Sequence, residues 1–423
     1  MKLKNFFLFL LIITFLSAPA LADIPKLELN CVSAILINLE TGNTMFELDA
    51  DLKRYPASLT KIMTALVSLE NAELSDIIEV TAETFKSLGS YSSTSGLLVG
   101  EQLTLEQMLC CLMIPSGNDA ANALAIHISG SVENFADLMN KKADSLGLKN
   151  THFVNPHGLH DENHYTTARD MSVLTIAAME NETFERICNL TSYTLTPNSV
   201  RENDFILRTT NRIILDKDPN FYPYASGIKT GFTTPAGNCL VSSAFKNEKH
   251  YLSVVLGAPT GADNIALSFA ETKKMFEWGF NNFKYFNILA ANTPVGEVKV
   301  NYAQKTDSII AIVNEDLRQL MPADFDAEAI SLTNVLPEDI DAPVTKGQVL
   351  GSVTVTYKGE MLGTIPLVAQ TQIDRSNFLY SAAKIKAFFL SPIMLGIFSL
   401  ILVLLIAYIT ISVIVTKKKK IKK

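Results

Sequence analysis

The sequence has few cysteines and no excess of positive charge. Its net charge is −7 over 423 residues, which argues against nucleic acid as a partner. The five cysteines are an odd number, and Cys110 and Cys111 are adjacent, without the spacing of a metal site or a disulfide framework. We interpret them as buried small hydrophobes and leave a disulfide between distant members open. There is also no internal repeat and no low-complexity tract besides a C-terminal run of lysines.

The N-terminus has the pattern of an export signal. Lys2 and Lys4 precede an apolar stretch at 6–16, and the small-residue pattern Ala20-Leu21-Ala22 follows. We expect a signal peptide at 1–22 and a mature chain that begins near Asp23. No cysteine follows Ala22, so the cleavage site is not of the lipoprotein type.

The C-terminus has the pattern of a membrane anchor. Residues 388–415 contain no charge, and "KKKKIKK" follows directly. A buried core helix rarely combines this length with a basic stop, and lysines after an apolar span mark its cytoplasmic side. We therefore predict a single-pass transmembrane anchor at 388–416, a basic cytoplasmic tail at 417–423 and an extracytoplasmic chain at the cell membrane.

Two domains are expected between these ends. β-rich runs flank Glu40-Thr41-Gly42-Asn43, a mostly helical stretch covers 70–195, strands return at 225–257 and a helix follows at 264–283. This order predicts an α/β domain at 23–288, an antiparallel sheet with helices on its faces.

The second domain reads as all-β. Alternating runs such as "GSVTVTYKGEMLGTIPLV" pair around Lys358-Gly359 and predict a small β-rich domain at 292–378. It contains no nucleophile–base pair, and its simplest role is a spacer above the membrane.

The stretch "ASLTKIMTAL" at 57–66 places a serine and a lysine on one helical turn. Residues three apart share a helix face, so Ser58 and Lys61 lie side by side among apolar neighbours. Alone, the pair could be an N-cap serine and a lysine whose stem lies along apolar surface. A second reading is a nucleophile next to its base.

Two later stretches favour catalysis. Ser116-Gly117-Asn118 precedes an apolar helix, and Lys229-Thr230-Gly231 lies on a strand of the late sheet. Together with Ser-x-x-Lys they form the three-part set of penicillin-recognising serine enzymes. With "THFVNPHGLH", "HYTTARDMS" and "APVTKGQVLGSV", the chain from about 28 to 375 resembles the D-alanyl-D-alanine carboxypeptidases of peptidase family S11, the low-molecular-mass penicillin-binding proteins.

The resemblance implies a penicillin-binding/serine β-lactamase-like fold and a role for each motif residue. Ser58 would be the nucleophile, Lys61 its base and Ser116 a proton relay. Asn118, Lys229, Thr230 and Gly231 would bind substrate, and the backbone N–H groups of Ser58 and Phe232 would form the oxyanion hole.

The implied activity is removal of the terminal D-alanine from peptidoglycan pentapeptide stems through an acyl-enzyme, without metal or cofactor, with β-lactams as covalent inhibitors. D,D-endopeptidase action, weak β-lactamase action and a non-catalytic cell-wall scaffold are the alternatives. The region 157–170 offers no match to the deacylating glutamate of class A β-lactamases, so trapped β-lactams should leave slowly.

Other polar residues have simpler readings. His157 and His160 lack a third metal ligand at proper spacing, and His157 fits a structural role in a loop near the site. Thr167 and Asp170 fit a helix capping box better than a catalytic Asp170. Trp278 is expected to pack. Neither Arg208 nor Arg212 can be matched to the arginine that helps some relatives bind the substrate carboxylate.

Overall fold

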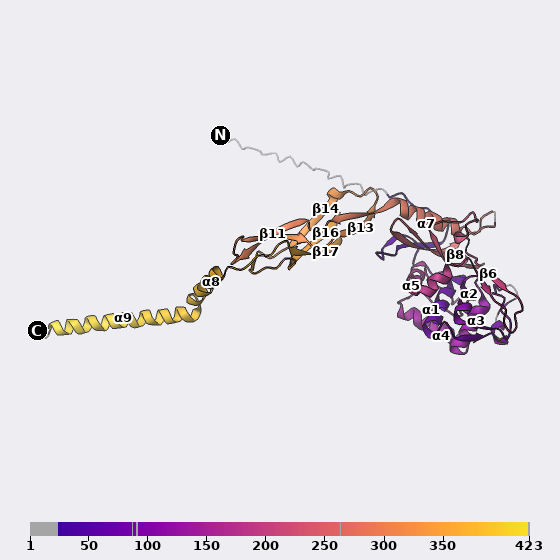
Figure 1. Ribbon diagram of the computed structural model, residues 1–423, viewed down its shortest axis with the longest axis horizontal. Coiled ribbons are helices and arrows are strands. Elements are labelled where there is room, and N and C mark those ends of the chain that lie inside the picture. The colour runs from indigo at the N-terminus through magenta and orange to yellow at the C-terminus, as the bar shows by residue number, and fades with distance from the viewer. Residues whose placement is uncertain (1–23, 87, 90–91, 263, 422–423) are drawn as a thin grey trace, which may run out of the picture. The chain divides into compact units, whose positions relative to one another are not determined.

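The computed structural model describes residues 24–86, 88–89, 92–262 and 264–421, so the predicted signal peptide lies outside the described residues. The chain divides into two compact units, one ending at Phe283 and one beginning at Lys284. Each has its own hydrophobic core. Figure 1 draws the first in indigo to pink and the second in orange to yellow.

A five-stranded antiparallel sheet organises the first unit. Its strand order β2-β1-β9-β8-β7 makes neighbours of strands from the two ends of this unit, with Ser33 opposite Leu256 and Asn38 opposite Tyr251. Among the described residues, strand β7 is at the edge of this sheet and pairs with β8 alone. The strands are β1 (Ser33–Asn38), β2 (Thr44–Leu48), β7 (Ala225–Thr233), β8 (Gly237–Lys246) and β9 (Lys249–Ala258).

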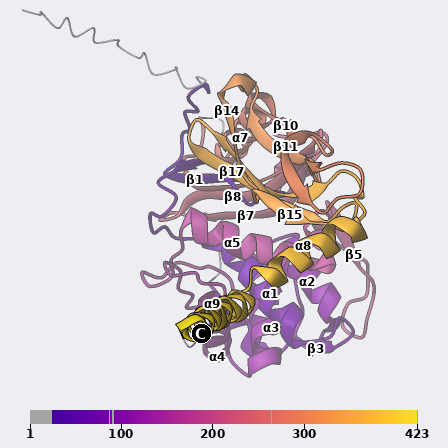
Figure 2. The same cartoon turned by 90° about the vertical axis from the view of Figure 1, so that its left-hand side faces the viewer.

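Helices cover both faces of this sheet, with α7 (Ser268–Asn282) on one side and α5 (Ala168–Met179) on the other (Figure 2). Tyr251 of β9 donates to the Gly279 carbonyl of α7 at 3.2 Å. The alternate residues Leu252 and Val254 are in the core that the helical layer shares. Strand β9 is apolar on both faces because both are buried. The predicted antiparallel sheet with helices on its faces is confirmed.

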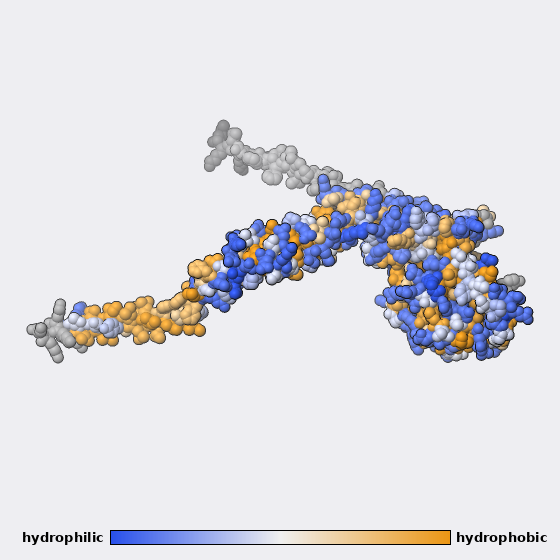
Figure 3. Space-filling view, in the orientation of Figure 1, coloured by the Kyte–Doolittle hydropathy of each residue, from blue (hydrophilic) through white to orange (hydrophobic). Residues whose placement is uncertain are grey.

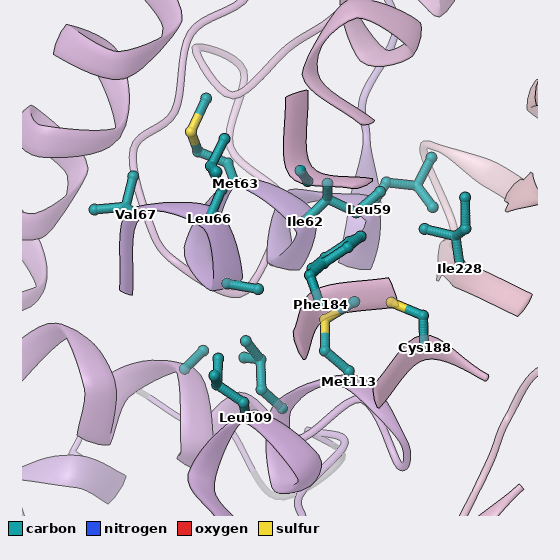
Figure 4. Packing of buried hydrophobic residues seen from close by; sticks show 14 of the residues in the cluster. Leu59, Ile62, Met63, Leu66, Val67, Leu109, Met113, Phe184, Cys188 and Ile228 are labelled. Atoms are coloured by element: carbon teal, nitrogen blue, oxygen red, sulfur yellow. The ribbon is translucent and has the colours of Figure 1, made fainter. Parts of the chain in front are cut away.

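The helical layer packs around α1 (Lys61–Asn71), which the one-turn 3₁₀ helix η1 (Ala57–Thr60) precedes. Apolar residues at i, i+3 and i+4 from Leu59 to Val67 lie opposite Leu109, Met113 and Phe184 (Figure 4). This spacing is the predicted helical periodicity. The other helices of the layer are α2 (Leu105–Met113), α3 (Asn118–Ser129), α4 (Val132–Ser145) and α6 (Glu182–Cys188).

Shorter elements connect these helices. They are the hairpins β3 (Ile77–Glu79) with β4 (Gln102–Thr104) and β5 (Ser192–Leu195) with β6 (Phe205–Arg208), and the 3₁₀ helices η2 (Ala82–Phe85) and η3 (Arg212–Ile214).

The predicted capping box of α5 is half correct. Thr167 caps the helix, since its side chain accepts from the Asp170 N–H at 3.0 Å. The Asp170 carboxylate accepts instead from Asn150 N and Thr151 Oγ1, both at 2.8 Å. Asp170 therefore ties the 150–151 segment to α5, because its carboxylate is engaged by donors from that segment.

The second unit is built on a six-stranded sheet of order β14-β16-β17-β12-β11-β15, antiparallel except between β11 and β15. Positive φ angles at Lys358 and Gly359 make the tight β16–β17 turn, which confirms the predicted hairpin. A two-stranded ladder pairs β10 with β13. The elements are β10 (Phe283–Leu289), β11 (Pro294–Asn301), β12 (Ser308–Val313), β13 (Leu317–Pro322), η4 (Ala327–Ala329), β14 (Ile330–Val335), β15 (Asp339–Asp341), β16 (Val349–Tyr357) and β17 (Glu360–Ala369).

Two helices follow this sheet. Within α9 (Pro392–Ile421), residues Pro392–Lys417 are long and apolar enough to cross a membrane, and none of the residues in the most apolar part of this stretch is buried. Its hydrophobic exterior is visible in Figure 3. Phe388 and Phe389, which the predicted anchor at 388–416 includes, are the last two residues of a separate helix, α8 (Asn377–Phe389). Pro392 is at the first position of α9, where proline starts a helix without loss of a hydrogen bond.

The β14–β16 pairing leaves no room for a side chain at Gly351. A Cβ there would lie 2.0 Å from the Val335 carbonyl oxygen. We expect Gly351→Ala to destabilise the second unit by about 1–3 kcal/mol, because β14 must move away from β16. Urea or thermal unfolding measures this loss.

Gly363→Ala in β17 is the matched control. Its Cβ would meet only the Leu317 side chain, at 3.3 Å, which can adjust. Equal unfolding midpoints for the two variants would contradict this account of β14–β16 packing.

Candidate active site

The candidate nucleophile lies on a turn that other segments hold closely. Ser58 is in η1, and the preceding Ala57 has φ +48°. A Cβ on Gly158 would lie 1.9 Å from the Ala57 carbonyl oxygen, and one on Gly231 would lie 3.1 Å from Ser58 N. Position 158 therefore requires glycine, and at position 231 a side chain would have to push the nucleophile turn back by a few tenths of an ångström. Ser58 caps nothing with its side chain, so the N-cap reading of this serine is wrong.

Lys61, the first residue of α1, is completely buried. Its Nζ lies 3.1 Å from Ser58 Oγ, 2.6 Å from Asn118 Oδ1 and 2.8 Å from the His157 carbonyl oxygen. Burial, and then the charge of Lys229, lower the pKa of Lys61 well below its usual range. The alternative reading of this lysine required its head group to reach solvent. The head group is buried, so that reading is wrong.

The Ser116-Gly117-Asn118 turn leads into α3. Ser116 has φ +66°, an uncommon conformation for a residue with a side chain. Asn118 donates from Nδ2 to Ser92 Oγ at 2.6 Å, which orients its Oδ1 toward Lys61. The Ser116–Asn118 turn therefore contacts the Ser58–Lys61 pair through the hydrogen bond between Asn118 Oδ1 and Lys61 Nζ.

The Lys229-Thr230-Gly231 motif lies on the edge strand β7. Lys229 is buried, donates to the Thr230 carbonyl at 2.9 Å, and burial lowers its pKa to about 7. Thr230 Oγ1 lies 2.7 Å from Thr210 Oγ1. Strand β7 thus presents the Thr230 hydroxyl beside that of Thr210, while its Lys229 is buried.

A cleft of about 290 Å³ opens over these motifs. Lys61, Asn118 and Lys229 are buried and are not among the described lining residues, which include no carboxylate and no arginine. The lining consists of Ser58, Ser93, Ser116, Thr210, Thr230, Gly231, Phe232, Asn238, Cys239, Ala266, Ser268 and Phe269.

The loop at 154–164 holds the nucleophile turn from the other side. Val154 N donates to His164 Nδ1, so His164 Nε2 carries the proton and donates to Thr60 Oγ1 at 2.8 Å. Thr60 in turn donates to the Ala57 carbonyl. Burial lowers the pKa values of His157 and His164 to about 3, so both rings are neutral at ordinary pH.

The remaining polar residues predicted from sequence lie apart from the chemistry. His160 packs edge-on against Tyr55 at 4.5 Å between ring centroids. Arg212 pairs with Asp218 at 2.6 Å. Trp278 packs against Phe46 and Phe283.

All five cysteines are free thiols. No group of three or more histidine, cysteine or acidic residues that could hold a metal occurs in the described part of the chain.

Sequence reasoning missed several residues that the fold brings to the site. Ser92 and Thr210 contact motif side chains, and the His157 backbone carbonyl contacts Lys61. A backbone carbonyl carries no sequence signal, whereas "SSTSG" and "RTTN" are polar loops whose hydroxyl groups could have been considered.

The fold and this arrangement define a serine enzyme of the penicillin-binding class. The family model described as D-alanyl-D-alanine carboxypeptidase matches residues 20–260, and the model for the C-terminal domain of penicillin-binding protein 5 matches residues 283–375. The chain belongs to peptidase family S11, the D-alanyl-D-alanine carboxypeptidases.

Named relatives and solved structures agree. The carboxypeptidase DacF of Bacillus subtilis is 34% identical over 82% of this chain and 87% of its own, and DacA of Escherichia coli K12 is 31% identical over 83% and 85%. Penicillin-binding protein 5 of Haemophilus influenzae superposes with a TM-score of 0.62 at 29% identity, covering 83% of this chain and 100% of its own. The Streptomyces K15 DD-transpeptidase gives 0.56 at 30% identity, covering 61% and 100%.

We expect the second-order rate constant for acylation by benzylpenicillin to be bell-shaped in pH. As a base Lys61 must be neutral, so the rate should fall as pH drops through its lowered pKa. Lys229 has a pKa of about 7, so its attraction for the ligand carboxylate should weaken above that pH. Stopped-flow measurement of acylation between about pH 4 and pH 10 follows the fall in rate at low pH, the acid limb, and the fall at high pH, the alkaline limb.

Lys229→Arg separates the two limbs. Arginine stays charged throughout this range, so the alkaline fall should disappear while the acid limb remains. A flat wild-type profile would exclude Lys61 as the base.

Proposed function

We propose that this membrane-anchored serine carboxypeptidase removes the terminal D-alanine from peptidoglycan pentapeptide stems through an acyl-enzyme on Ser58. The observation that carries the proposal is the environment of Lys61 Nζ. A neutral amine has two hydrogens and one lone pair. Asn118 Oδ1 and the His157 carbonyl can only accept, and they take the two hydrogens. The lone pair is then left for the hydroxyl of Ser58, 3.1 Å away.

The acylation step follows from these positions. Ser58 Oγ attacks the carbonyl carbon of the penultimate D-alanine while its proton passes to Lys61. The backbone N–H groups of Ser58 and Phe232 stabilise the negative oxygen of the tetrahedral intermediate. The C–N bond then breaks, Ser116 relays a proton to the leaving D-alanine nitrogen, and the acyl group remains on Ser58 as an ester.

Substrate binding is assigned to the residues around β7. The terminal carboxylate is held by Lys229 and the hydroxyl of Thr230, next to Thr210. Gly231 lets the peptide lie against the strand, and Asn118 binds its carbonyl. Water then hydrolyses the ester and regenerates Ser58.

A β-lactam forms the same ester but leaves slowly. The described cleft lining contains no carboxylate to activate a water molecule. This favours a long-lived penicilloyl adduct over β-lactamase activity.

We assign the catalytic domain to 23–288 and the β-rich domain to 292–378. We place both outside the cytoplasm, with the C-terminal span as anchor and residues 417–423 on the cytoplasmic side. The apolar stretch of α9 supports this placement, as does the positive-inside rule applied to the lysines that follow.

Intact-mass spectrometry of the full chain in detergent with benzylpenicillin tests the nucleophile. We expect one stable adduct on the wild type and none on Ser58→Ala, because the acyl bond is to that oxygen. Folded wild type that takes no adduct would contradict the enzymatic proposal and favour a cell-wall scaffold, whose peptidoglycan binding would survive Ser58→Ala.

Product analysis tests the substrate. A pentapeptide stem should release D-alanine, whereas a cross-linked dimer should be cleaved more slowly. Faster cleavage of the dimer would identify an endopeptidase, and rapid turnover of the penicillin would identify a β-lactamase.

A further inference from the structure

The second residue of α3, Asp119, is completely buried. Its carboxylate accepts from the N–H groups of Ser95 at 2.8 and 3.0 Å, Leu97 at 3.2 Å and Ala120 at 2.9 Å, and from Ser95 Oγ at 2.9 Å. All of these donors are neutral. A buried carboxylate is costly unless such bonds satisfy it, so the donors of Ser95, Leu97 and Ala120 are what make this buried position tolerable.

These bonds hold segment 92–97 against the turn that carries Ser116 and Asn118. The backbone N–H of Asn118 donates to the Ser93 carbonyl at 2.8 Å, and its side chain donates to Ser92 Oγ at 2.6 Å. Ser93 Oγ donates to the Pro115 carbonyl at 3.2 Å. Segment 92–97 thus forms one wall of the candidate active site, and Ser93 lines the cleft.

The turn beneath this wall is strained and crowded. Ser116 has φ +66°, which costs free energy and persists only where the surroundings enforce it. A Cβ on Gly117 would lie 2.7 Å from Asp119 Oδ1 and 2.8 Å from Ser95 Cβ. The Asp119–Ser95 contact therefore closes directly over the strained turn.

The other end of the wall is anchored separately. Arg201 Nε donates to Glu101 Oε1 at 2.7 Å, and Arg201 Nη2 donates to the Gly96 carbonyl at 2.7 Å. Of the two buried carboxylates that hold this wall, Asp119 is the one next to the Ser116–Asn118 turn and the one whose charge acts on Lys61.

We propose that Asp119 is a positioning residue for the acyl transfer: through Ser95 it holds segment 92–97 against the Ser116–Asn118 turn, which keeps Asn118 aimed at Lys61 and Ser116 in the cleft beside Ser58. The inference rests on the proposed function, since it concerns the same reaction. Asp119 itself does not touch the substrate and acts through these neighbours.

The charge of Asp119 has a second effect, on Lys61. The groups that face Lys61 are Lys229 from β7, Asp119 from α3 and the neutral His157 from the 154–164 loop. Lys229 lowers the pKa of Lys61 and Asp119 raises it. Removal of the Asp119 charge should therefore lower that pKa further and move the acid limb of acylation to lower pH.

The test compares Asp119→Asn with Ser95→Ala in the full chain in detergent, with benzylpenicillin acylation followed by intact mass across pH. Asp119→Asn should lower the plateau rate by about tenfold or more, as small misplacements of catalytic groups do, and shift the acid limb to lower pH. Ser95→Ala should lower the plateau acylation rate without changing the pH of the acid limb, because it removes a hydrogen bond but no charge.

Asp170→Asn is the matched control. Asp170 is also a buried carboxylate near a helix N-terminus, and it also accepts from neutral donors. Its loss should lower the thermal midpoint but leave plateau and limb unchanged.

The proposal would be overturned if either test variant had the plateau acylation rate of the wild type. It would also be overturned if the acid limb lay at the same pH in the wild type and in Asp119→Asn. If Asp119→Asn does not fold, the plateau of Ser95→Ala decides alone. A wild type that takes no adduct would instead overturn the proposed function.

Discussion

A completely buried lysine that contacts three separate parts of the chain is the constraint on which the first unit depends. The turn η1, the start of α3 and the 154–164 loop all contact one atom, Lys61 Nζ. An isolated buried ammonium is costly, so a lysine in this position is stable mainly as the neutral amine. The same burial that constrains the fold therefore favours the protonation state that the proposed role as a base requires.

Strain and close approach surround this lysine. Ala57 and Ser116 both have positive φ. Gly158 leaves no space for a side chain next to the nucleophile turn, and Gly231 packs closely against it. Such geometry costs stability and is found where a site must be held in one arrangement. The large shared core of helices and sheet supplies the stability that offsets it.

Position in the sheet explains why the cleft is open. Strand β7 is an edge strand, so its outer backbone groups are free of a neighbouring strand, and an extended peptide can lie beside it. The hydroxyl groups of Thr230 and Thr210 lie at this edge, and Lys229 is buried. The described lining contains no arginine that could match the one used by some relatives, and Arg212 is paired with Asp218.

Much of the architecture could be predicted from sequence because it depends on local patterns. Ser58 and Lys61 are one turn apart, so their proximity follows from helical geometry alone. The Lys358-Gly359 hairpin and the apolar stretch of α9 follow from turn chemistry and composition. The end of α8 at Phe389 could not be predicted in this way. Apolar residues lie on both sides of Ser391, so the sequence looks like one continuous apolar helix.

By itself the sequence determined which residue types were available: a serine–lysine pair, two polar motifs and an apolar terminal segment. Tertiary structure alone decided that the Asn118 amide, the His157 carbonyl and the Asp119 carboxylate act on one amine. These groups are separated from Lys61 by tens of residues in sequence, and one of them belongs to the backbone, which every residue shares. Their effect on Lys61 arises from burial and distance, and both exist only after the layers have packed together.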